Sequence, residues 1–213
     1  MNILHLDPQF AVVEKEPGIL SQDDGKGRRN LPRLLREEIG GEIFPVHRLD
    51  RETGGIMVYA RTSSAASCLS KAIAEGSFYK EYHAVLCACP NKTEDTLTDL
   101  LFYDRQKNKV FPVKRERKGV KRAVLHYHLI ASSSPLALVR VNLQTGRTHQ
   151  IRVQFAGRKM PLWGDPKYGG KGSGLALFCS LLSFPHPETG NMLSFTLPLP
   201  ETEPWSLFDR KLK

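Results

Sequence analysis

Apolar and polar positions alternate along this chain with two different spacings. A helical spacing, with apolar residues three and four apart, predicts helices over residues 31–39, 63–75 and 148–156. Alternation or short apolar runs rich in β-branched and aromatic residues predict strands over 3–6, 10–15, 55–59, 78–89, 123–130, 136–143, 175–184 and 192–197. Many short strands with few helices favour an α+β fold with a mixed, mostly antiparallel sheet flanked by helices.

Residues that begin and end helices support two of these predictions. Asn30 stands where an N-cap belongs, and Gly40 follows the last apolar position of the first helix. Ser63 or Ser64 is expected to cap the second helix, and Gly76 to end it. Both helices carry one apolar face, as expected for helices that pack on a sheet.

Length and composition predict a single domain over residues 1–213. A chain of this size buries roughly 70% of its unfolded surface, so it can form a core without metals or disulfides. No apolar run reaches the ~20 residues needed to cross a bilayer, and the N-terminus lacks the order of a signal peptide. We therefore expect a cytoplasmic protein. The four cysteines have no C-x-x-C spacing, so we expect reduced thiols and no metal site.

The charge of the chain is strongly basic and concentrated in one segment. The formal net charge is +9, and residues 104–122 carry nine Lys and Arg against Asp104 and Glu116. Such a balance favours a polyanionic partner, nucleic acid first and an anionic membrane second. A solvated, mobile loop is the alternative for a charge run of this kind, and a flexible basic loop can also become ordered on RNA.

The strongest candidate for chemistry is the stretch from Pro45 to Ala60. Its first half is polar and its second half is apolar, which predicts a loop held by a buried strand. Asp50 lies between Arg48 and Arg51, and neighbouring guanidinium groups would keep this carboxylate ionised. A surface loop with a loose ion pair is the alternative.

Two motifs in this chain resemble those of one enzyme family. His47-Arg48-Leu49-Asp50 with Thr53-Gly54-Gly55 is similar to the catalytic motif of the RluA class of RNA pseudouridine synthases. Residues 145–152, which read TGRTHQIR, are similar to its second motif, and the resemblance covers nearly the whole chain. It implies the pseudouridine synthase fold, in which a central active-site cleft crosses the sheet. It also implies an isomerase that converts specific uridines of ribosomal or transfer RNA to pseudouridine by base flipping.

The resemblance also implies roles for particular residues. Asp50, Tyr82 and Arg152 correspond to the catalytic group: Asp50 acts at the sugar, Arg152 pairs with it, and Tyr82 stacks on the base or moves a proton. From the residues alone, Tyr82 would be read as a half-buried tyrosine of a sheet, and Lys15 as a solvated lysine of a hairpin. The substrate-binding residues implied are Arg48, which fills the space of the flipped base, with His47, Thr53, Arg147, His149, Gln150 and Lys15.

The chain departs from the family pattern in two places. Gly54 stands where serine is usual, and Cys179 lies in a segment where a histidine is frequent. Gly54 lacks the serine hydroxyl and is expected to loosen the loop without touching the aspartate. The absent histidine is expected to affect substrate preference more than activity. The chain also begins almost at the first catalytic strand, so we expect the catalytic domain to recognise RNA without an N-terminal RNA-binding module.

The reaction is an isomerisation, so no cofactor is expected. RNA is the expected partner, with no membrane and no metal, and a monomer is the default state. The main alternative is a non-catalytic RNA-binding protein that has kept the fold. A carboxylate-dependent glycosidase or nucleosidase ranks last, because no second acidic residue is evident as its paired acid.

Overall fold

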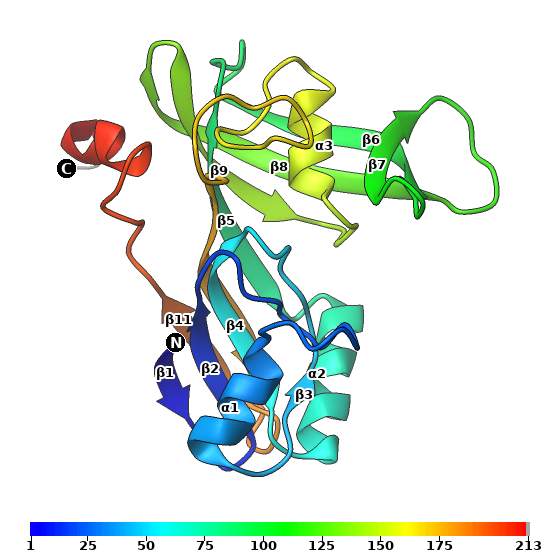
Figure 1. The fold of residues 1–213 in the computed structure, drawn as a ribbon, viewed down its shortest axis with the longest axis vertical. Helices are drawn as coiled ribbons and strands as arrows, with labels where there is room; N and C mark the ends of the chain where they lie inside the picture. Colours follow the sequence, from blue (N-terminus) through cyan, green and yellow to red (C-terminus); the bar gives the residue numbers. More distant parts are fainter. Residues whose placement is uncertain (212–213) are drawn as a thin grey trace. The chain divides into compact units, whose positions relative to one another are not determined.

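The computed structural model describes residues 1–211, which divide into two compact units. The first unit contains Met1–Lys80 and Cys179–Pro198, and the second contains Glu81–Phe178 and the segment from Leu199 onward. Each unit has its own share of strands and helices (Figure 1). The candidate catalytic residues are divided between the units, with Asp50 in the first and Tyr82 and Arg152 in the second.

The first unit is built on strands from both ends of the chain. β1 (Asn2–Leu6), β2 (Phe10–Lys15), β4 (Gly54–Ala60) and β10 (Leu177–Pro185) lie side by side in that order. β3 (Phe44–Pro45) pairs with β4, and β11 (Met192–Thr196) pairs with β10. The β2–β4 pair is antiparallel and places Lys15 opposite Gly55. This register brings the end of β2 to the loop that carries Asp50.

Two helices belong to the first unit. α1 (Leu31–Ile39) begins at Asn30, whose side chain accepts a hydrogen bond from the N–H of Arg33, as predicted. α2 (Ser63–Glu75) has Thr62 as its N-cap, not Ser63 or Ser64, because the Thr62 hydroxyl accepts the Ala65 N–H at 3.1 Å. The α2 face with Ala65, Leu69 and Ala72 packs on β2, β4 and β10 in one apolar core.

The second unit is an antiparallel sheet with one helix. Its strands follow the order β5 (Tyr79–Leu86), β9 (Leu136–Leu143), β8 (Val120–Ser133), β6 (Glu94–Asp104) and β7 (Lys109–Val113). α3 (Gln150–Ala156) contributes Val153 to a core with Leu101, Val110 and Ala123, and the 3-10 helix η1 (Trp205–Lys211) follows near the C-terminus.

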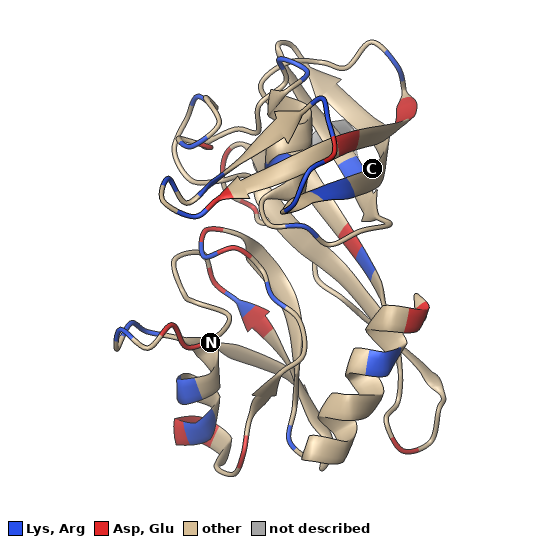
Figure 2. Ribbon diagram, turned by 90° about the vertical axis from the view of Figure 1, so that its right-hand side faces the viewer, with Lys and Arg blue, Asp and Glu red and all other residues tan. Residues whose placement is uncertain are grey.

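The mostly antiparallel sheet with helices is as predicted, but several bounds differ. β6 and β7 were not predicted, and β7 lies inside the basic segment 104–122 that was interpreted as a loop. α3 begins at Gln150 instead of Thr148, because His149 has a left-handed φ of 52°. In the second unit, Lys and Arg lie on loops and also on strands, among them Lys121 and Arg122 of β8 (Figure 2). No helix within residues 1–211 is long and apolar enough to cross a bilayer.

Candidate active site

The loop that carries Asp50 is fixed through its own backbone. The Thr53 N–H donates to the carbonyl of Asp50 at 3.0 Å, which closes a turn around the aspartate. The hydroxyl of buried Ser21 donates to the carbonyl of Leu49, whose side chain is also buried. Asp50 itself is partly buried. The carboxylate is therefore presented from a backbone that is held on both sides of it.

Lys15 is the main anchor of this loop. Its side chain is 0% exposed, and Nζ donates to the carbonyls of Thr53 at 2.7 Å, Arg51 at 2.8 Å and Glu16 at 3.1 Å. These acceptors match the N–H groups of an ammonium. Burial lowers the pKa of Lys15 to about 8, although the carboxylates of Glu52 and Asp50 act in the opposite direction. Lys15 therefore lies at the loop, as predicted, but its donors are used inside the protein.

The turn after β2 contacts the same loop. The Gly18 N–H donates to the carbonyl of Arg51 at 2.8 Å, so this oxygen accepts from both Gly18 and Lys15. The Arg51 guanidinium points elsewhere, because its Nε donates to Glu52 at 2.6 Å. Arg48 is exposed. An exposed arginine next to a fixed aspartate is available to a large ligand such as RNA.

Gly55 at the start of β4 allows a close approach of two backbones. Its φ is +116°, and a Cβ at this position would lie 2.5 Å from the backbone nitrogen of Cys179 and closer still to the Cys179 carbonyl oxygen. Only glycine combines this positive φ with the absence of a Cβ that would meet the Cys179 backbone. Cys179, one of the departures from the family pattern, thus lies in β10 directly beside the start of β4, the strand that follows the Asp50 loop.

His47 is held in one orientation. Its Nε2 accepts the Val58 N–H at 3.1 Å, so the neutral ring carries its proton on Nδ1. Burial, followed by the charge of Lys80, holds the pKa of His47 well below its usual range. Among described residues, the buried Nδ1 of His47 and the buried hydroxyl of Thr53 have no hydrogen-bond partner.

In the second unit, Arg152 forms a buried ion pair. Its Nε donates to Asp165 Oδ2 at 2.7 Å and its Nη2 to Oδ1 at 2.8 Å, in the two-pronged geometry that suits guanidinium and carboxylate. Asp165 Oδ1 also accepts the backbone N–H groups of Lys167 and Tyr168. The ion pair with Asp165 uses two of the five N–H groups of the guanidinium.

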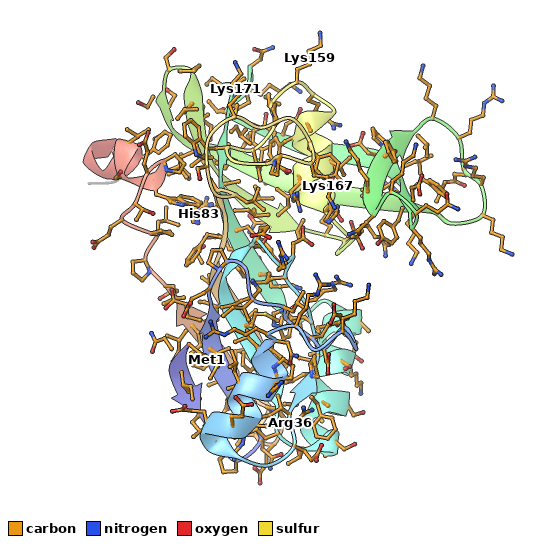
Figure 3. The ribbon with its side chains drawn as sticks, viewed as in Figure 1. Met1, Arg36, His83, Lys159, Lys167 and Lys171 are labelled. Atoms are coloured by element: carbon orange, nitrogen blue, oxygen red, sulfur yellow. The ribbon has the colours of Figure 1, made fainter. Side chains whose placement is uncertain are left out.

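Tyr168 connects this ion pair to the neighbouring elements. The Arg152 guanidinium lies 5.3 Å from the centroid of its ring, and its hydroxyl contacts His149 Nδ1 at 2.9 Å. The same hydroxyl accepts the N–H of Val110 in β7. The loop residue Lys167, labelled in Figure 3, donates to the carbonyl of Asn108. The orientation of α3 and its arginine therefore depends on residues 165–168.

Asp165 and Tyr168 were not among the predicted site residues. The sequence contains the motif Gly164-Asp165-x-x-Tyr168-Gly169, which resembles the family pattern. Its spacing alone does not indicate a role for Asp165 or Tyr168. Asp165 is thirteen residues from Arg152, so their contact depends on tertiary packing and could not be predicted from the periodicity of the sequence.

Gln150 holds the turn before α3. It is buried, and its Oε1 accepts from the Thr145 hydroxyl and the Arg147 N–H while its Nε2 donates to the Val124 carbonyl. These contacts favour a positioning role over direct contact with substrate. Arg147 is exposed, and its Nε donates to the carbonyl of Arg122 at 3.0 Å.

Tyr82 lies on β5 opposite Val141 of β9 and is 5% exposed. The prediction of a strand tyrosine is confirmed, and its catalytic role stays a prediction. Within the described residues, no group of three or more His, Cys, Asp or Glu side chains could hold a metal ion.

Comparison with known proteins identifies the family. Residues 9–157 match the family model described as RNA pseudouridylate synthase. The chain belongs to this family, which confirms the resemblance of its two motifs.

Several relatives are similar to most of the chain. The chain is 34% identical over 169 residues to an uncharacterized RNA pseudouridine synthase, YlyB, of Bacillus subtilis, covering 76% of the chain and 55% of that protein. It is 32% identical over 227 residues to ribosomal large subunit pseudouridine synthase D of Xanthomonas campestris, covering 94% of the chain and 66% of that protein. The chain thus spans about half to two thirds of the length of these relatives.

The fold agrees with a solved human structure. The protein titled human RNA pseudouridylate synthase domain containing 4 has a TM-score of 0.77 at 24% identity, and the match covers 99% of this chain and 91% of that one. At this level of identity the likeness confirms the fold alone.

Proposed function

We propose that this protein is an RNA pseudouridine synthase that isomerises specific uridines in ribosomal or transfer RNA. The observation that supports this most directly is the Asp50 loop, which the buried Lys15 holds by the carbonyls of residues 51 and 53. It supplies one fixed carboxylate, in a chain of the matching family. The name of the Xanthomonas relative favours ribosomal large subunit RNA as the first substrate to test.

The proposed reaction breaks one bond and makes another within the same nucleotide. The bond between N1 of uracil and C1′ of the ribose breaks, the base turns, and a bond forms between C5 and C1′. The proton on C5 leaves, and N1 holds a proton in the product, so no atoms are gained or lost overall. Asp50 acts at C1′, as a nucleophile or as a base that also stabilises positive charge. Both routes need an ionised and positioned carboxylate.

The second unit contributes the remaining catalytic groups in this proposal. Asp165 fixes the Arg152 guanidinium, and the remaining N–H groups of Arg152 are proposed to keep Asp50 ionised and oriented. Tyr82 stacks on the detached base or takes part in moving the C5 proton. Because these residues and Asp50 belong to different units, we also propose that residues 1–213 act as one catalytic domain.

The implied substrate-binding residues separate into two groups. Arg48 and Arg147 are exposed and suit contact with RNA, and Arg48 is proposed to fill the space that the flipped base leaves. His149 lies at the start of α3 and has one ring nitrogen bonded to Tyr168. Lys15 and Gln150 have their donors engaged within the protein, so we propose that they act by positioning the site.

The Asp50→Asn variant tests the catalytic role. RNA from cells with and without the gene is compared by chemical mapping of pseudouridine, and the deletion is complemented with wild type, Asp50→Asn or Glu52→Gln. Glu52→Gln is the matched control, since it removes one negative charge from an exposed position of the same loop. Sites that disappear on deletion should return with wild type and Glu52→Gln and stay absent with Asp50→Asn.

The same experiment can reject the proposal. If no site changes in any RNA, or if Asp50→Asn restores every site, the protein is not a synthase that uses this aspartate. The non-catalytic RNA-binding alternative would then be favoured. The identity of the restored sites decides between ribosomal and transfer RNA. A cytoplasmic location is proposed together with this substrate, and the monomeric state stays a prediction.

A further inference from the structure

A pocket of about 650 Å³ opens in the second unit, in a region that no proposed catalytic residue lines. It lies between the end of β6, the start of β8 and the turn that leads into α3. Its wall includes Leu101, Tyr103, Val110, Lys121, Arg105 and Arg147. Asp50, Tyr82 and Arg152 are not among its described lining residues.

The floor of this pocket is apolar and comes from one face of the sheet. Tyr103 and Val110 are cross-strand partners, and so are Leu101 and Lys121, so the side chains of each pair project to the same side. Leu101 and Val110 are buried in the core beneath α3. The Tyr103 ring is 38% exposed, and its hydroxyl donates to Asn108 Oδ1 at 2.8 Å. A flat ring is thus presented above an apolar floor.

The rim of the pocket is cationic. Arg105, Lys121 and Arg147 are all exposed, against the single carboxylate of Asp104. The bond from Arg147 Nε to the carbonyl of Arg122 fixes that guanidinium at the rim. The pocket therefore combines an aromatic surface with an excess of positive charge. This combination suits a ligand that has a flat ring and a phosphate.

We infer that this pocket binds an unpaired nucleotide of the RNA that flanks the target uridine. The base would stack on Tyr103, and Lys121 and Arg105 would contact the phosphates on its two sides. A base paired within a duplex keeps its faces covered by its neighbours, so the pocket selects single-stranded RNA. The inference rests on the proposed function, because that function makes RNA the substrate and places Arg147 at its backbone.

Binding of a short labelled RNA tests this inference. The probe is fluorescein-labelled oligouridylate of about ten nucleotides, comparable to the site size of single-strand binding folds. The comparison probe is a strand of the same length without bases. The dissociation constant is measured by fluorescence anisotropy over a series of salt concentrations for wild type, Tyr103→Ala, Tyr103→Phe and Lys121→Ala.

Tyr103→Ala and Lys121→Ala should affect RNA binding in different ways. Tyr103→Ala should weaken binding of oligouridylate about tenfold through loss of stacking, with Tyr103→Phe close to wild type and the baseless strand unaffected. Lys121→Ala should weaken binding of both strands and reduce the salt slope by about one. Lys71→Ala on α2 is the charge-matched control, because its side chain is 74% exposed and lies in the other unit.

Other outcomes would overturn the inference. Binding by Tyr103→Ala and Lys121→Ala that equals binding by Lys71→Ala would show that the pocket takes no part. Equal competition by duplex RNA would reject the preference for an unpaired nucleotide. Pseudouridine mapping with Asp50→Asn is independent of these measurements. Sites restored by wild type, together with pocket variants that bind normally, would reject the pocket and leave the proposed function standing.

Discussion

Replacing Asp165 by Asn should destabilise the second unit strongly and disable Arg152. The carboxylate is 0% exposed and bonds both Nε and Nη2 of the guanidinium. Asn can keep the acceptor that serves Nη2 and the backbone N–H groups of Lys167 and Tyr168. Its NH₂ group would then face the Arg152 Nε–H, donor against donor, and the buried arginine would lose its counter-charge.

The expected loss in the free energy of unfolding is about 3–5 kcal/mol, as for other buried ion pairs that lose one partner. The matched control is Asp99→Asn, which affects the Arg158–Asp99 pair. The atoms of that pair are also 2.8 Å apart, but the two side chains are 32% and 21% exposed. Solvent screens such a pair, so the control should cost about 1 kcal/mol or less.

Urea unfolding followed by circular dichroism measures both variants against wild type at neutral pH. A double variant, Arg152→Met with Asp165→Asn, should recover most of the stability because it removes both buried charges and keeps the acceptor for the Lys167 and Tyr168 N–H groups, yet it should form no pseudouridine. If Asp165→Asn costs no more than Asp99→Asn, the buried ion pair does not hold the second unit together, and the reasoning on the orientation of Arg152 fails with it.

Two further predictions concern the first unit. The pKa of Lys15 is lower in the folded protein than in the unfolded chain, so the folded protein binds this proton more weakly. The free energy of unfolding of wild type should therefore rise by up to ~3 kcal/mol relative to Lys15→Met as the pH rises from about 8 to about 10.5. Denaturant unfolding across this pH range measures the difference in the free energy of unfolding between wild type and Lys15→Met. A difference that does not change with pH would contradict the lowered pKa of the buried Lys15. Gly55→Ala should cost more than about 4 kcal/mol, because its Cβ meets the Cys179 backbone. Gly76→Ala, at φ +79° in open space, should cost only about 1 kcal/mol, and equal melting temperatures for the two variants would disprove the clash.

The elements that could be predicted from the sequence are those whose signals are local. α1 was predicted with its bounds because Asn30 and Gly40 act within a few residues of the helix ends. The motifs likewise identified the family, since each is a contiguous stretch. The N-cap of α2 was misplaced by one residue because Thr62, Ser63 and Ser64 are all good caps, and only the backbone conformation distinguishes them.

The features that were missed depend on distant residues. β7 was hidden because its charged neighbours resemble a solvated loop, although Val110 is buried against α3. The partner of Arg152 could not be read from spacing, and neither could the burial of Lys15. In both cases a charged side chain that looks available to a substrate in the sequence is engaged by protein atoms in the structure.

The anchor of the Asp50 loop has a consequence for how this protein can vary. The hydrogen bonds that Lys15 donates to this loop go to main-chain oxygens of residues 51 and 53, so they place no demand on the identity of the side chains there. Arg51 and Glu52 are exposed or partly exposed and pair with each other. Substitutions at these two positions can therefore alter the electric field around the aspartate while its coordinates stay the same. The position of the aspartate and the charge around it are thus set by different atoms, so the charge can change without a new backbone arrangement.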